Sequence, residues 1–134
     1  MGENKEQIIY VCVAGCRDYH NYAVVSEYLD YVLQNLKKQG TICIVNGGAP
    51  GVDKLGILYS LRHKGFIHKE FFARWDLYNK SAGPRRNREM VDFLQKQEKA
   101  YVVAFWDGRS RGTYSLICEA QKANLPLKIK HINK

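Results

Sequence analysis

Long apolar segments are absent from this sequence of 134 residues. No apolar run approaches the roughly 20 residues that a helix needs to cross a bilayer, and the longest are short patches such as residues 8–14. Residues 1–7 are polar and charged, so they lack the apolar core of a secretory signal. We therefore expect a soluble, cytoplasmic protein with no membrane partner.

The signatures of metal sites and of common catalytic sites are also missing. The chain has four cysteines, Cys12, Cys16, Cys43 and Cys118, which are scattered singly, and three of the four lie in segments typical of a buried strand or helix. We expect reduced, structural thiols. Cys12 and Cys16 form a C-x3-C pair, but no further ligands follow at metal-ligand spacing, so we expect no metal and no cofactor. No Gly-x-Ser-x-Gly motif occurs, which disfavours serine hydrolysis.

The composition fits one small, basic domain. A chain of 134 residues with 46% hydrophobic content can bury a single core, so we expect one domain over residues 1–134. Lysine and arginine outnumber aspartate and glutamate by 21 to 13, and the formal net charge is +8. Such a surplus favours an anionic partner, and nucleic acid, a nucleotide or an acidic membrane surface would all fit it. A surplus that only serves solubility fits the charge equally well.

Apolar patterning predicts alternating strands and helices. The β-branched or alternating runs predict strands at residues 8–14, 41–45, 66–72, 100–105 and 127–132, and three- and four-residue spacing predicts helices at 22–36, 52–63, 86–97 and 113–123. Residues 73–85 lack an apolar period and are expected to form a long functional loop. The alternation predicts an α/β fold, a single Rossmann-like three-layer domain with a mostly parallel sheet of about five strands.

Glycine, arginine and hydroxyl groups gather after the predicted strands, where open parallel sheets bind their ligands. Gly15 and Arg17 follow the first strand, although Arg17 could instead form a surface salt bridge with Asp18. After the second strand come Gly47, Gly48, Gly51 and Asp53. Free amides in such a loop would suit a phosphate. The alternative is a tight strand-to-helix turn in which the Asp53 carboxylate interacts favourably with the positive end of the helix dipole.

A second glycine-rich loop follows the fourth predicted strand and adds cations. It contains Gly108, Arg109, Ser110, Arg111, Gly112 and Thr113. We expect an anion site, because glycine permits close approach and a helix start offers oriented N–H groups. Ser110 or Thr113 could cap the helix or bond a phosphate oxygen. An exposed capping loop whose arginines face water is the alternative.

Arginines also cluster where the third helix is expected to begin. Arg85, Arg86 and Arg88 lie within one turn of that start, where the helix dipole disfavours cations, so a bound phosphate is an economical explanation. Trp75 and Trp106 follow strands and could stack on a base, or could equally pack at the edge of the core. Basic residues among aromatics would also suit a nucleic-acid strand.

Four motifs, taken in order along nearly the whole chain, resemble the YspA-like branch of the SLOG superfamily. They are residues 13–17 (VAGCR), 46–53 (NGGAPGVD), 82–87 (AGPRRN) and 108–113 (GRSRGT). The resemblance implies a Rossmann-like fold that binds nucleotides or ADP-ribose-derived ligands, and it adds Asn87 to the candidate site. A related branch of phosphoribohydrolases uses a helix-start arginine, matched by Arg86, and a glutamate that falls here on Leu116.

Three functions remain open at this point. The preferred one is a sensor or sequestering protein, of the kind found in nucleotide-signalled bacterial or phage conflict systems, that binds a nucleotide or ADP-ribose-type molecule without altering it. A hydrolase of the same ligand is the second, and Asp53, Asp107 or Glu119 could then replace the missing glutamate. Single-stranded nucleic-acid binding is the third. The tyrosines Tyr19, Tyr22 and Tyr31 exceed what a small domain needs, so we also expect a homo-oligomer.

Overall fold

A five-stranded, wholly parallel sheet forms the centre of the molecule in the computed structural model, which describes residues 7–133. The strands lie in the order β3-β2-β1-β4-β5. Their bounds are Ile8–Gly15 (β1), Thr41–Asn46 (β2), Ile67–Glu70 (β3), Ala100–Trp106 (β4) and Leu127–His131 (β5). The predicted α/β class and parallel sheet are thus confirmed, and the third strand is shorter than predicted.

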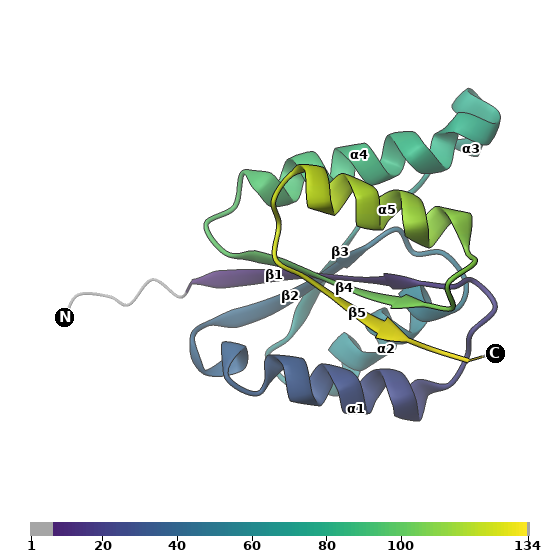
Figure 1. The fold of residues 1–134 in the computed structure, drawn as a ribbon. Coiled ribbons are helices and arrows are strands. Elements are labelled where there is room, and N and C mark those ends of the chain that lie inside the picture. Colours follow the sequence, from purple (N-terminus) through teal and green to yellow (C-terminus); the bar gives the residue numbers. More distant parts are fainter. Residues whose placement is uncertain (1–6, 134) are drawn as a thin grey trace.

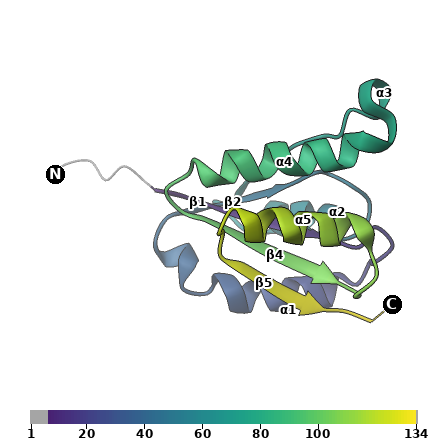
Figure 2. The same cartoon turned by 45° about the horizontal axis from the view of Figure 1, so that its top comes forward.

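Helices cover both faces of the sheet, as Figures 1 and 2 show. The pair on one face is α1 (Tyr22–Leu33) and α2 (Val52–Arg62), and the pair on the other is α4 (Ala82–Gln95) and α5 (Arg111–Lys122). A 3-10 turn, η1 (Leu36–Lys38), follows α1. Among residues 7–133, no helix combines the length and apolar character needed to span a membrane.

The two apolar layers follow from the alternation of side chains along buried strands. Val11 and Val13 of β1 pack in the layer that contains Leu29 of α1. The intervening Cys12 belongs to the opposite layer, together with Leu94 of α4. Because β1 is covered on both sides, its sequence is a continuous apolar run. The three-layer arrangement follows directly.

The order of the strands creates a switch point beside β1. The chain moves outward from β1 to β2 and β3, then returns to place β4 against the other side of β1. The connections after β1 and β4 therefore diverge to opposite faces of the sheet. In open parallel sheets, this is where a crevice forms outside the carboxyl ends of the strands.

The expectation of a long loop over residues 73–85 is wrong. This segment contains the short helix α3 (Trp75–Tyr78), the 3-10 turn η2 (Asn79–Ser81) and the first turn of α4, which begins at Ala82. No apolar period is visible in it because Trp75, Leu77 and Tyr78 are exposed rather than packed on the sheet. Pro84 is tolerated there, since the N–H groups of a helix's first turn have no intrahelical acceptors to lose. Arg86 consequently lies in the second turn of α4.

Candidate functional site

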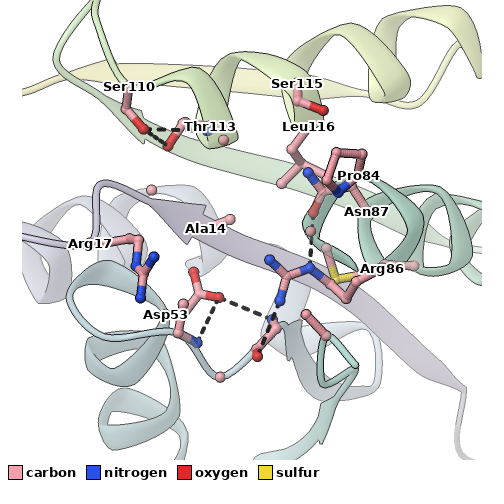
Figure 3. Close-up of a pocket in the computed structure, with 18 of the residues that line it drawn as sticks. Ala14, Arg17, Asp53, Pro84, Arg86, Asn87, Ser110, Thr113, Ser115 and Leu116 are labelled. Carbon is pink, nitrogen blue, oxygen red and sulfur yellow. Dashed lines mark hydrogen bonds between the residues drawn. The ribbon is translucent and has the colours of Figure 1, made fainter. Parts of the chain in front are cut away.

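A cavity of about 560 Å³ lies at the carboxyl ends of the strands (Figure 3). Most of the predicted site residues line it: Gly15, Arg17, Gly47, Gly48, Asp53, Trp75, Arg86, Asn87, Ser110, Arg111, Gly112 and Thr113. Gly51, Arg85, Gly108 and Arg109 are not among its lining residues. The loops after β1, β2 and β4 and the start of α4 thus meet around one space, as the rule for switch points predicts.

The loop between β2 and α2 is held by its own side chains. The fully buried Asn46 donates from Nδ2 to the Val13 carbonyl at 3.1 Å and to the Asp53 carbonyl at 2.9 Å. The amides of Gly47 and Ala49 donate to Asp53 Oδ2 at 3.0 and 3.3 Å. Asn46 Oδ1 accepts from the Gly48 amide at 3.0 Å. The amides predicted to bind phosphate here already bind a carboxylate and an amide of the same loop.

Asp53 is a buried acid at the floor of the cavity. Burial raises the pKa of its carboxyl to about 6, although the amides of Ala49 and Gly47 and the nearby Arg86 charge oppose that rise. Its side chain is only 5% exposed. Burial outweighs the hydrogen bonds because removing a carboxylate from water is costly. The structure thus places a carboxyl group that titrates near neutrality against the ligand space.

Gly51 shapes the loop without lining the cavity. Its φ is +82°, a backbone conformation that favours glycine, and a Cβ there would overlap the backbone of Cys16 and Arg17. Gly51 caps the start of α2, and the next amide, that of Val52, donates to the Cys16 carbonyl at 3.2 Å. The glycine therefore lets the start of α2 pack against the loop that presents Arg17.

Arg86 is clamped at the rim between the β2 loop and the end of β3. Its Nη1 donates to the Gly47 carbonyl at 3.3 Å and to the Phe71 carbonyl at 3.5 Å. Its Nε donates to Oδ1 of the buried Asn87 at 3.0 Å. Gly47 makes this possible, because a Cβ there would overlap the guanidinium. Figure 3 shows Arg86 reaching into the cavity from α4, toward Asp53.

The first turn of α5 presents open backbone donors to the cavity. Ser110 caps the helix, with Oγ accepting from the Thr113 amide at 3.4 Å and lying 3.1 Å from Thr113 Oγ1. The amides of Arg111 and Gly112 have no acceptor among residues 7–133. A Cβ added at Gly112 would meet nothing within 4 Å. Oriented N–H groups therefore face free space at a positive helix end.

The remaining candidates in this loop support it from outside. Asp107 Oδ1 accepts from the amides of Arg109 and Ser110 at 2.8 and 2.9 Å. Gly108 has a φ of +85°, as the turn requires. Trp106 donates from Nε1 to the Ser110 carbonyl at 3.0 Å and stacks on Tyr114 with ring centroids 5.6 Å apart. Trp106 thus packs at the helix start, and it is Trp75 that lines the cavity.

The lining combines three arginines with apolar surface. Arg17, Arg86 and Arg111 supply positive charge, and Asp53 is the one carboxylate among the lining residues that the structure describes. Apolar walls come from Phe72, Trp75, Met90 and Leu116. Phe72 and Trp75 are 62% and 53% exposed. Such a cavity can accept a ligand that is anionic at one end and flat and apolar at the other.

Several lining residues were absent from the prediction: Ala14, Ala49, Pro50, Phe72, Ala73, Gly83, Pro84, Met90, Ser115 and Leu116. Phe72 was assigned to the end of the third predicted strand, and because β3 ends at Glu70, it belongs instead to the segment that follows the strand. Met90 lies one helical turn after Arg86, and Ser115 lies one turn after Arg111. Extending each predicted site along its helix by one turn would have found these two.

The fold and this cavity define the class of the protein, an α/β domain with a cation-lined cavity at its strand ends. The chain is 36% identical, over 93 residues, to the Gene 61 protein of Mycobacterium phage D29, and the match covers 64% of this chain and 69% of the phage protein. It therefore belongs to the same family as that phage protein. No protein-family model matches the chain. A phage relative fits the predicted bacterial or phage origin.

Proposed function

We propose that this protein binds a phosphate-bearing nucleotide or an ADP-ribose-derived ligand and serves as a sensor or a sequestering protein. The observation that carries the proposal is the open first turn of α5, whose Arg111 and Gly112 amides face a cavity also lined by Arg17 and Arg86. We further propose that the chain is a member of the SLOG superfamily, on the four motifs that gather around this cavity.

The phosphate belongs at α5 in this proposal. The amides after β2 are occupied by Asp53 and Asn46, whereas those at the start of α5 are open. A helix N-terminus attracts anions through its unpaired N–H groups and its dipole. Arg17 and Arg111 line the same space and add full charges. Guanidinium groups match phosphate oxygens in bidentate geometry, which favours phosphate over a simple halide.

The base belongs at the opposite end, against Phe72 and Trp75. Both rings are more than half exposed although they line a cavity, so covering them with a flat apolar group would remove their surface from water. The cavity volume of about 560 Å³ lies within the range of small-molecule sites. A nucleotide combines the required phosphate and ring in one molecule.

Hydrolysis of the bound ligand is the second candidate, and Asp53 is the observation that favours it. A carboxyl group with a pKa of about 6 can exchange protons near neutral pH. Of the three acids considered, Asp53 lines the cavity, whereas Asp107 and Glu119 are not among the lining residues. Leu116 does line it, where the related hydrolases carry glutamate, and so the binding role is preferred.

A thermal-shift panel of AMP, ADP-ribose, NAD and short oligonucleotides tests the proposal. We expect a stabilising shift with AMP or ADP-ribose that Arg86→Ala abolishes. Arg88→Ala is the matched control, since Arg88 is exposed on the same helix and does not line the cavity. Mass spectrometry of the recovered ligand separates the roles, because an intact ligand supports sensing or sequestration and a cleaved ligand supports the hydrolase.

The same panel tests single-stranded nucleic-acid binding, which the net charge of +8 favours. That function would give affinity that rises with oligonucleotide length and falls steeply with salt. A response to oligonucleotides alone would contradict the proposal. A shift by the mononucleotide that falls less steeply with salt than oligonucleotide binding does would support it.

A further inference from the structure

A second cavity, of about 350 Å³, lies next to the first and is not explained by the binding of one nucleotide. Both cavities are lined by Phe72 and Arg86, so these two side chains form the ridge between them. The short helix α3 contributes lining residues to both cavities, since Trp75 lines the first cavity and Leu77 and Tyr78 line the second. Figures 1 and 2 show α3 beyond the end of α4, away from the sheet.

The second cavity repeats the chemistry of the first. Arg85 lies over the ring of Tyr78, with its guanidinium carbon 4.2 Å from the ring centroid. Its Nε donates to Ser81 Oγ at 3.2 Å, and Arg85 forms no ion pair within residues 7–133. Arg74 also lines this space, but Asp76 neutralises it through two contacts of 3.2 Å. Arg85 and Arg86 thus supply positive charge to this cavity, against the single carboxylate of Glu89 in its lining.

The same cavity exposes apolar surface that the fold does not use. Leu77 and Tyr78 are 58% and 42% exposed, and both line it. An aromatic ring of a ligand could cover the Tyr78 and Leu77 surfaces while its phosphate contacts Arg85 or Arg86. Glu89 also lines this cavity and can accept hydrogen bonds from ribose hydroxyls or a base amino group. A cation, an apolar face and a hydrogen-bond acceptor together match a nucleoside phosphate.

We infer that the ligand is a dinucleotide with its terminal phosphate at the start of α5, one nucleoside in each cavity and the linking phosphate at the ridge formed by Arg86 and Phe72. This inference rests on the proposed function, because it extends the same site. It assigns Arg85 a ligand contact outside the first cavity. The 3′–5′ phosphodiester of pApA fits this placement, because its free 5′-phosphate can reach α5, whereas the 5′–5′ pyrophosphate of NAD leaves no terminal phosphate for α5.

Calorimetric titration with AMP, NAD and pApA tests the inference. We expect pApA to bind at least about tenfold more tightly than AMP, and more tightly than NAD, since a stacked ring and a charged hydrogen bond would be added. Tyr78→Ala should remove that advantage, and Leu77→Ala should reduce it. Both side chains are exposed, so these substitutions leave the core intact. Tyr78→Phe keeps the aromatic face and should keep the advantage.

Each alternative outcome has a distinct meaning. If AMP binds and neither dinucleotide binds more tightly, the inference is overturned while the proposed function stands. If no nucleotide binds, the proposed function fails as well. If affinity keeps rising from pApA to an oligonucleotide of about ten residues, the ligand is a nucleic-acid strand and the dinucleotide assignment is wrong. An advantage of one dinucleotide that survives Tyr78→Ala would also overturn the use of the second cavity.

Discussion

Asp53 occupies, within its own loop, the place where an external anion would otherwise meet the backbone amides. Its carboxyl accepts hydrogen bonds from the Gly47 and Ala49 amides while buried beneath the cavity. The sequence offered both interpretations, because a glycine-rich loop ending in an aspartate fits a phosphate cradle and a self-capped turn. Only the path of the backbone decides which acceptor those amides reach.

Asp53 should make stability depend on pH. Its folded pKa of about 6 lies above the model-peptide value of 3.8, so the folded protein holds this proton more tightly. The associated stability is present below about pH 4 and is lost as pH rises through about 6, with a total of about 3 kcal/mol. The amide oxygen introduced by Asp53→Asn would still accept from both backbone amides but would not titrate. We expect urea unfolding from about pH 4 to 7 to show this loss in the wild type relative to Asp53→Asn; a constant difference would contradict it.

Gly47 should act on binding through Arg86. A methyl group at Gly47 would overlap the guanidinium and push it from the Gly47 and Phe71 carbonyls. We expect Gly47→Ala to weaken nucleotide binding about as much as Arg86→Ala, by about tenfold or more, since both remove one charged contact. Adding Arg86→Ala to Gly47→Ala should then cost little, as titration of all three variants would show.

Arg88→Ala is the control for this comparison, because Arg88 is exposed on the same helix as Arg86 and does not line the cavity. Independent, additive effects of Gly47→Ala and Arg86→Ala would contradict the coupling. The sequence identified Gly47 as a site residue but for a different reason. Its importance comes from a side chain of α4, 39 positions away in the chain, and apolar periodicity carries no information on that contact.

At the scale of the elements, a substitution at the start of α5 should lower ligand binding without lowering the stability of the protein. Gly112→Asp places a carboxylate beside a positive helix end, which favours the helix by about 0.3–1 kcal/mol. The same carboxylate would occupy the space proposed for the ligand phosphate. We expect melting curves at or above the wild-type temperature and a complete loss of the nucleotide-induced shift.

Gly112→Ala should keep more of the nucleotide-induced shift than Gly112→Asp, because it adds a methyl group to this space but no charge. A Gly112→Asp protein that still binds the nucleotide as tightly as the wild type would show that the phosphate lies elsewhere. A Gly112→Asp protein that melts well below the wild type would contradict the helix-dipole argument.

The strands and the helices that pack on the sheet could be predicted from the sequence, and the exposed segment between β3 and α4 could not. Helices α1, α2 and α5 and strands β1, β2 and β4 bury one side or both, so their apolar spacing marks them clearly. Helix α3 and the first turn of α4 bury little apolar surface, and so residues 73–85 resembled a loop. The predicted helix therefore began at residue 86, whereas α4 begins at Ala82 and Arg86 lies in its second turn. Arg86 was nevertheless identified as a site residue.

At the scale of the whole molecule, strand order decides what the cavity contains. Alternating strands and helices predict a parallel sheet but not that β4 returns beside β1. That return brings the start of α5 to the loop after β1, where Arg17 and Arg111 line one space. The rule for switch points located the site by strand ends, while the apolar walls formed by Phe72, Met90 and Leu116 lie just beyond the segments that the rule selected.

Association of the chain remains a prediction. Of the three tyrosines behind it, Tyr19 is buried and Tyr22 packs against the core, whereas Tyr31 is 63% exposed. Exposed apolar side chains also occur at Leu61 and along residues 72–78. We expect light scattering at micromolar concentration to give the mass of a homo-oligomer, because association would bury these exposed apolar side chains between copies of the chain. A monomeric mass would overturn that prediction.

The most direct test of the central claim is a titration of ¹⁵N-labelled protein with ADP-ribose, followed by amide NMR shifts. We expect saturable shifts at Arg111 and Gly112, whose amides are open, with smaller changes along residues 47–49, whose amides stay bonded to Asn46 and Asp53. Absence of shifts, or shifts confined to the opposite edge near Lys99 and Gly40, would contradict binding at the carboxyl ends of the strands.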